Sequence, residues 1–103
     1  MTIAELDPKR VWKIFYALTQ IPRPSKKELK AADFVEKFGK EHGLETYRDT
    51  LGNIIIRKPA TPGYENRKGV ILQGHLDMVP QNNADTPHDW ENDPIDAYEY
   101  EID

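Results

Sequence analysis

The sequence predicts an α/β fold in which two helices are followed by a β-hairpin and then by a buried strand of a mixed sheet. Three observations predict this order. Two segments in the first half carry apolar residues at helical spacing. A turn-rich segment then separates two short runs with strand character. Finally, a short apolar run at residues 69–73 ends abruptly in turn residues, as a buried strand does.

The first helix is predicted from its start and from its apolar face. Asp7 can cap the helix, and Pro8 fits the first helical position because its missing N–H would have no partner there. Four apolar residues follow at spacings of three and four, which gives one apolar face: Val11, Ile14, Phe15 and Leu18. The prolines within residues 21–24 end this helix, because proline removes a donor and disfavours helical backbone before it.

The second helix is predicted to start at Ser25 and Glu28, which have capping-box spacing. Its apolar face repeats the helical spacing at Ala31, Phe34, Val35 and Phe38. Gly43 fits the left-handed position that follows a helix. His42 would then lie at the negative end of the helix dipole. We therefore interpret His42 as a residue of the helix end rather than as a metal ligand.

The second half of the chain has mainly strand and loop character. Residues 45–48 and 54–56 are short strands of a predicted hairpin, joined by the turn-rich residues 49–53. The buried strand at residues 69–73 follows a loop that is rich in proline and polar residues. Residues 98–103 alternate apolar and acidic side chains, as a half-buried strand does. This alternation stops at an aspartate, which commonly begins a turn, so we expect a truncated chain.

Composition limits the class of protein. A chain of 103 residues forms one small domain, and 38% hydrophobic with 31% charged residues is typical of soluble proteins. The absence of cysteine excludes disulfides and thiolate sites, so a zinc site would use histidine and carboxylates. The N-terminus lacks the pattern of a signal peptide, and no apolar run could span a bilayer. We expect a cytoplasmic protein that does not bind membranes.

Charge is distributed unevenly along the chain. Residues 1–68 carry all 14 Lys and Arg against 9 acids, a net charge of +5, whereas residues 69–103 carry 9 acids and no Lys or Arg, a net charge of −9. Such an acidic segment is either a solvated tail or a region near a cation or basic partner, and both interpretations stay open. No basic patch is interleaved with aromatic residues, so we expect no binding to nucleic acid.

The chemistry of the chain centres on His75 and Asp77, which directly follow the predicted buried strand. Residues i and i+2 of an extended backbone point to the same side, so the two side chains could converge beyond the strand end. Open α/β sheets place their sites there. Both residues could bind a metal ion, or His75 could bind it while Asp77 orients the imidazole ring. A histidine near a strand end can also be purely structural.

Residues 74–81, Gly-His-Leu-Asp-Met-Val-Pro-Gln, resemble the first metal motif of the zinc-dependent peptidase and aminoacylase superfamily. The resemblance is closer to its aminoacyl-histidine dipeptidase branch, whose members hydrolyse Xaa-His dipeptides such as β-alanyl-histidine. Residues 21–25 with Glu28, residues 49–60 and residues 88–95 agree with the same branch. These motifs together cover nearly the whole chain and are specific.

This resemblance implies a hydrolase in which two zinc ions, or cobalt or manganese in their place, share a bridging water. His75 corresponds to a ligand of one metal ion, and Asp77 corresponds to the catalytic-site residue that orients this ligand. The other ligands and the general base of the family would follow residue 103. We therefore expect residues 1–103 to be the N-terminal portion of the catalytic domain, without the rest of that domain or the smaller second domain.

Further expectations follow from the resemblance. The substrate would be a dipeptide, and the full enzyme would be a homo-oligomer. The 103-residue chain alone would be inactive, and its unpaired apolar strand would promote association. His88 and Asp89 are not expected to bind metal, because the family does not use this loop for metal ions.

Other interpretations stay open. The chain could be a catalytically silent truncated fold or an interaction module, or it could come from another peptidase or deacylase of the superfamily. Tight metal binding would distinguish an enzyme from a silent fold. Metallophosphoesterase and amidohydrolase sites are less consistent with the sequence, because no second histidine lies within ten residues of His75.

Overall fold

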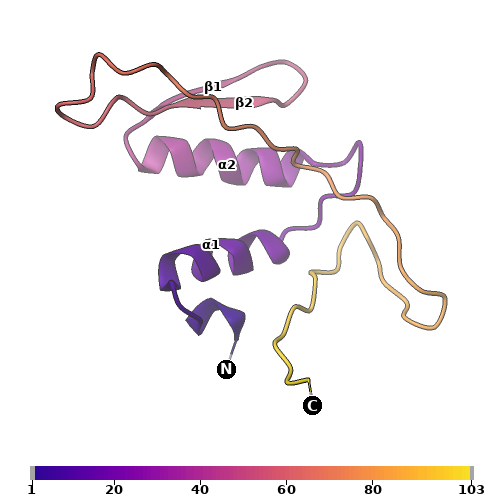
Figure 1. Ribbon diagram of the computed structural model, residues 1–103. Coiled ribbons are helices and arrows are strands. Elements are labelled where there is room, and N and C mark those ends of the chain that lie inside the picture. The colour runs from indigo at the N-terminus through magenta and orange to yellow at the C-terminus, as the bar shows by residue number, and fades with distance from the viewer. Residues whose placement is uncertain (1, 103) are drawn as a thin grey trace. The chain divides into compact units, whose positions relative to one another are not determined.

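The structure is a computed structural model that describes residues 2–102. It contains, in order along the chain, the 3-10 helix η1 (Ile3–Glu5), the helices α1 (Lys9–Thr19) and α2 (Leu29–Glu41), and the strands β1 (Glu45–Arg48) and β2 (Ile54–Arg57) (Figure 1). Two helices followed by a hairpin is the predicted order. The chain divides into two compact units, residues 1–31 with 77–103 and residues 32–76, and each is described by itself.

Helix α1 begins one residue later than predicted and is fixed at both ends. Pro8 is the residue before the helix, with φ −70° and ψ 126°, and Lys9 is the first helical residue. The backbone N–H of Trp12 donates to the carbonyl of Pro8 at 3.2 Å. At the other end, Arg23 Nη1 donates to the carbonyl of Leu18 at 2.5 Å. The same carbonyl of the last turn also accepts the backbone N–H of Ile21 at 3.2 Å.

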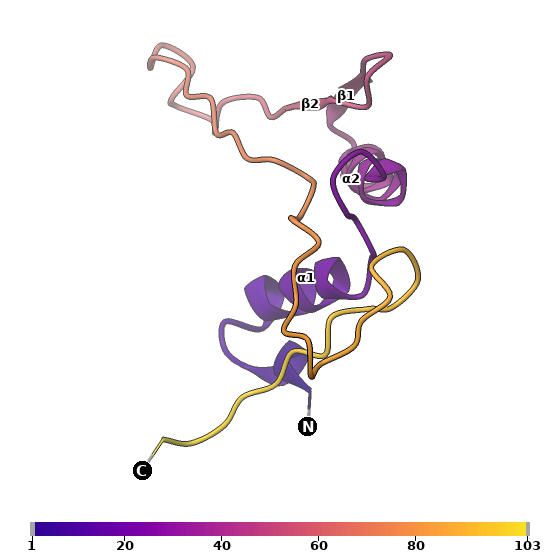
Figure 2. The ribbon, with the colours of Figure 1, turned by 90° about the vertical axis from the view of Figure 1, so that its right-hand side faces the viewer.

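The first unit has a small core. Ile3 of η1 and Ala31 at the start of α2 are buried, with exposed fractions of 5% and 0%, and Thr19 is a buried polar residue at the end of α1. Helix α1 lies against η1 (Figure 2). The predicted apolar face of α1 is only partly covered, because Val11 and Phe15 stay 61% and 47% exposed.

The predicted capping box at the start of α2 is wrong. A tight turn precedes the helix instead, in which the N–H of Lys27 donates to the carbonyl of Pro24 at 2.9 Å. Lys26 within this turn has a φ of +72°, a left-handed backbone that non-glycine residues rarely adopt. The helix starts only at Leu29. The Ser25 hydroxyl donates to Asp77, far along the chain, so it does not cap the helix.

The end of α2 follows the prediction. Gly43 has a φ of +68°, the left-handed position after a helix that glycine adopts without strain. The ring of His42 lies against Phe38 with 4.1 Å between ring centroids, and its Nδ1 is 2.8 Å from the Phe38 carbonyl oxygen. His42 therefore lies at the helix end, where its backbone N–H also donates to the Phe38 carbonyl at 3.2 Å.

Strands β1 and β2 form an antiparallel hairpin that packs on α2 (Figure 1). The contact is close at Gly39. A Cβ atom at this position would lie 2.3 Å from Thr46 Oγ1 and 3.0 Å from Ile56 Cδ1. The helix and the sheet can therefore approach each other this closely only because residue 39 is glycine. The cross-strand pairs are Glu45 with Arg57, Thr46 with Ile56, Tyr47 with Ile55, and Arg48 with Ile54.

The predicted buried strand at residues 69–73 is wrong. These residues form no strand, and Val70, Ile71 and Leu72 are 82%, 93% and 93% exposed. A strand needs a neighbour to satisfy its N–H and carbonyl groups. Within the described residues the sheet contains only β1 and β2, so it is antiparallel rather than mixed. The apolar run therefore has no strand beside it.

The predicted half-buried strand near the C-terminus is also wrong. Residues 98–102 form no strand, and residue 103 lies outside the described residues. Tyr98, Tyr100 and Ile102 are 71%, 74% and 83% exposed. The alternation of apolar and acidic residues specifies a strand only where a sheet edge is available, and no edge pairs with this segment.

Candidate functional site

The side chain of Asp77 is half-buried and held by Ser25. The Ser25 hydroxyl donates to Asp77 Oδ2 at 2.6 Å, a length typical of a hydroxyl bound to an ionised carboxylate. The two backbones are joined beside this contact by a parallel bridge between Pro24 and Met78. Met78 N–H donates to the Arg23 carbonyl at 2.9 Å, and Ser25 N–H donates to the Met78 carbonyl at 3.2 Å. Asp77 is therefore positioned by backbone and side-chain contacts together.

A third segment of the same unit is tied to this region. The backbone N–H of Ile95 donates to the carbonyl of Thr19 at 2.8 Å, which joins the C-terminal part of the chain to the end of α1. Lys27 and Glu91 form an ion pair between the turn before α2 and residues 88–95. Both side chains are more than half exposed, so solvent weakens this pair.

His88 and Asp89 take part in folding their own loop. Hydrogen bonds from the Asn92 side chain at 2.9 Å and from the Glu91 backbone at 3.0 Å lower the pKa of Asp89. The ring of His88 lies against Trp90 with 4.4 Å between centroids. The Asp89 carboxylate accepts the backbone N–H of Glu91, two residues on, and so closes a turn as a backbone carbonyl would. These contacts give both residues a structural role in the loop.

His75 lies in the unit formed by residues 32–76, whereas Asp77 lies in the other unit. His75 is exposed, in a segment without helix or strand. The convergence of the two side chains stays a prediction from their spacing in the sequence. The structure brings Asp77 together with Ser25, and the neighbouring Met78 together with Arg23 and Ser25.

The donors of this segment fit the chemistry of a divalent metal ion. A histidine imidazole and a carboxylate are common zinc ligands, and a carboxylate also orients ligand histidines. Across residues 2–102 there is no group of three or more His, Asp or Glu side chains that could hold a metal ion. His75 can therefore supply one ligand, and a complete site would need ligands from other residues.

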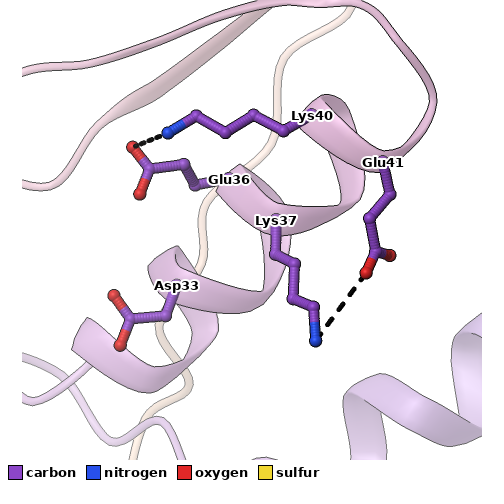
Figure 3. A pocket seen from close by; sticks show the side chains of 5 residues that line it. All are labelled: Asp33, Glu36, Lys37, Lys40 and Glu41. Carbon is purple, nitrogen blue, oxygen red and sulfur yellow. Dashed lines mark ion pairs between the residues drawn. The ribbon is translucent and has the colours of Figure 1, made fainter.

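A second surface, on α2, is charged but has the character of an ordinary solvated helix face. Figure 3 shows two ion pairs along it, Lys37 with Glu41 at 3.7 Å and Lys40 with Glu36 at 3.8 Å. Three of these four side chains are 60% or more exposed. Pairs at i and i+4 stabilise a helix slightly and create no enclosed site.

Sequence reasoning missed the role of Ser25. Its spacing to Glu28 indicates a helix cap, whereas its hydroxyl in fact donates to Asp77, 52 residues away. A single sequence carries no local sign of such a pairing. The adjacent prolines and the positive φ of Lys26 are consistent with a turn that turns this hydroxyl away from the helix.

Among the described residues, no helix combines the length and apolar character needed to cross a membrane. No protein-family model matches the chain.

Individual proteins do match it. The cytosol non-specific dipeptidase of Escherichia coli is 51% identical over 96 residues, which cover 93% of this chain and 20% of that enzyme. The crystal structure of aminoacylhistidine dipeptidase from Vibrio alginolyticus matches with a TM-score of 0.90 and 47% identity, covering 97% of this chain and 20% of that one. A protein of Pyrococcus abyssi, whose name assigns it LysW-lysine or LysW-ornithine hydrolysis, is 34% identical over 70 residues.

These matches confirm the α/β class and the resemblance stated from the motifs. The chain spans about a fifth of the length of the two dipeptidases that it matches, 20% in each case. It therefore corresponds to an N-terminal portion of such an enzyme.

Proposed function

We propose that the polypeptide carrying this chain is a metal-dependent dipeptidase that hydrolyses Xaa-His dipeptides such as β-alanyl-histidine. The reason is that the chain resembles the N-terminal portion of the aminoacyl-histidine dipeptidases. The observation that carries the proposal is the anchored carboxylate of Asp77, two residues after His75 in the matching motif. A cytoplasmic location is proposed from the name of the Escherichia coli relative.

The proposal gives the two residues different roles. His75 supplies an imidazole nitrogen as a metal ligand, and Asp77 has the role of orienting this ligand. Such a carboxylate fixes the tautomer and the orientation of the ring and raises its basicity. When bound, a pair of zinc ions, or of cobalt or manganese ions, lowers the pKa of water and polarises the scissile carbonyl.

We further propose that residues 1–103 form part of the catalytic domain. The remaining ligands and the general base come from residues outside this chain, together with a smaller second domain. The 103-residue chain alone then hydrolyses no dipeptide, because its described residues hold no cluster of three or more candidate ligands. The complete enzyme is proposed to be a homo-oligomer.

The range of substrates is the finer part of this proposal. One matching enzyme is named for aminoacyl-histidine and the other for non-specific dipeptide hydrolysis. Comparing kcat/KM for β-alanyl-histidine with that for a dipeptide without histidine, such as glycyl-leucine, separates these two possibilities. Equal values would support the non-specific alternative, and a preference for histidine would support the narrower one.

The experiment that tests the metal site uses a complete dipeptidase that carries this chain. We expect His75→Ala to nearly abolish hydrolysis and to remove one metal ion per subunit, measured by elemental analysis. Asp77→Ala is expected to retain metal but to lower activity by about 10–100-fold. His42→Ala, at the end of α2, is the matched control and should leave activity unchanged. Normal turnover of the His75→Ala enzyme at limiting zinc would contradict the proposal.

A catalytically silent fold or interaction module is the second candidate. It would show neither hydrolysis nor tight zinc binding in the same complete polypeptide. Removal of metal with a chelator, followed by addition of zinc, distinguishes the two. Activity that is lost and then restored identifies an enzyme.

A further inference from the structure

We infer that Ser25 is a positioning residue for Asp77 and, through it, for metal binding at His75. This inference rests on the proposed function. It starts from the hydrogen bond of 2.6 Å between the Ser25 hydroxyl and Asp77 Oδ2. Hydrogen bonds to an ionised carboxylate are about twice as strong as those between neutral groups, so this contact can restrict the rotation of the Asp77 side chain.

The backbone around Ser25 is itself fixed, which gives the hydroxyl a defined position. Its N–H donates to the carbonyl of Met78, and the N–H of Met78 donates back to the carbonyl of Arg23. Pro24, between them, is buried and forms the parallel bridge with Met78. The donor and the acceptor therefore belong to two segments that are already joined at the neighbouring residues. Little conformational freedom is left to lose when the hydroxyl bonds the carboxylate.

The unfavourable backbone conformation of the turn after Ser25 is consistent with a specific role for the position of the Ser25 hydroxyl. Lys26, the next residue, has the left-handed φ of +72°, which is unfavourable for a non-glycine residue. A standard helix cap at Ser25 would not require this conformation. Strained backbone is a feature of sites in which the position of a side chain matters. The turn directs the Ser25 hydroxyl to Asp77 and prevents it from capping α2.

The chemical consequence is a chain of contacts in which each group orients the next. With Oδ2 engaged by Ser25, the rotation of the Asp77 carboxylate is restricted, and the orienting role proposed for this carboxylate depends on that restriction. Loss of the hydroxyl should leave the fold intact but loosen the carboxylate. Metal affinity and turnover should then fall, whereas the KM for the dipeptide should change little, because the inferred role of Ser25 acts on the Asp77 carboxylate.

The test uses a complete dipeptidase that carries this chain, with Ser25→Ala, Ser25→Thr and the control Thr86→Ala. Thr86 is an exposed residue of the same unit, and its hydroxyl donates to the neighbouring Asp85 carboxylate at 3.5 Å. Zinc affinity is measured by competition with a chromogenic chelator, and kcat and KM with β-alanyl-histidine. We expect Ser25→Ala to weaken zinc binding and kcat by about 10-fold, the lower end for outer contacts of a metal site. Ser25→Thr, which keeps the hydroxyl, should retain most of both.

A double-mutant cycle separates this positioning role from a purely structural one. In the Asp77→Ala background, Ser25→Ala should cause no further loss of zinc affinity, because its target is gone. Equal effects in both backgrounds, or wild-type zinc affinity in Ser25→Ala, would overturn the inference while leaving the proposed function intact. If the wild-type enzyme itself binds no zinc, the proposed function fails first, and the inference fails with it.

Discussion

The guanidinium of Arg48 lies 2.6 Å from the carboxylate of Asp33, and this pair joins strand β1 to helix α2. Arg48 also lies 3.5 Å from Glu36, one helical turn further along α2. The hydrogen bond with Asp33 is the main reason why the pKa of Arg48 is raised. The exposed face of α2 thereby contributes to the packing of the hairpin.

We expect Arg48→Gln to lower the melting temperature of the protein, because it removes the positive charge that pairs with Asp33 and Glu36. The difference from the wild type should shrink as salt is raised from low ionic strength to 1 M, since salt screens exposed pairs. Differential scanning calorimetry at both salt concentrations measures this. Lys37→Gln, on the same helix but paired only with Glu41, is the control and should change stability less. An equal loss at both salt concentrations would show that packing, rather than charge, is responsible.

Gly39→Ala should destabilise the protein although alanine is the better helix former. The helix propensity of alanine contributes about 1 kcal/mol in favour of the variant. The added Cβ would lie 2.3 Å from Thr46 Oγ1, and overpacking of this kind typically costs about 1–3 kcal/mol. Thr46 cannot yield easily, because its side chain is β-branched. We expect a net loss of about 1 kcal/mol in the free energy of unfolding, measured by urea denaturation.

The double variant Gly39→Ala with Thr46→Ala tests the cause of this loss. Removal of Oγ1 relieves the closest contact, so the double variant should lose less than the sum of the two single variants. Additive losses would mean that the clash lies elsewhere. Lys40→Ala, exposed on the same helix, is the control for helix propensity, and it also removes the weak ion pair with Glu36.

The turn between β1 and β2 should make the hairpin sensitive to acid. The pKa of Asp49 lies below its ordinary value of 3.8, first because the Asn53 side chain donates to its carboxylate. A pKa that is lower in the folded state means that the stabilisation is present above about pH 4 and is lost as the pH falls through the folded pKa. Asn53→Ala should raise the pKa of Asp49 towards 3.8. NMR titration of the Asp49 carboxyl carbon measures this shift.

Asp89 serves as an internal reference in the same titration. Its pKa is lowered by contacts within its own loop, chiefly from Asn92. The Asn53→Ala variant should therefore leave the titration of Asp89 unchanged. A parallel change at both aspartates would indicate a general loss of structure rather than the loss of one hydrogen bond.

The exposed apolar run should promote association of the 103-residue chain. Val70, Ile71 and Leu72 are each more than 80% exposed, and apolar side chains in unpaired extended backbone favour pairing with another chain. We expect sedimentation velocity to show species larger than the monomer, increasing with concentration. Replacing all three residues by threonine should shift the distribution towards the monomer. A wild-type chain that stays monomeric at every concentration would contradict this prediction.

Local patterns determined most of the regular structure. The apolar spacing of α1 and α2, the prolines between them and Gly43 predict both helices to within a few residues. The hairpin follows from two short strand-forming runs and the turn residues between them. In each case the hydrogen bonds that define the element lie within a short stretch of chain, so nearby residues decide it.

Only the tertiary structure decided what pairs over a long distance. Residues 69–73 have the composition of a strand but no neighbour, because strand pairing depends on an edge that composition cannot supply. Ser25 fits a local cap pattern, yet its hydroxyl binds Asp77. The sequence alone thus determined the two helices, the hairpin and the motif around His75 and Asp77. The tertiary structure decided which donor holds the carboxylate, because a hydrogen bond between residues 52 positions apart depends on how the chain packs.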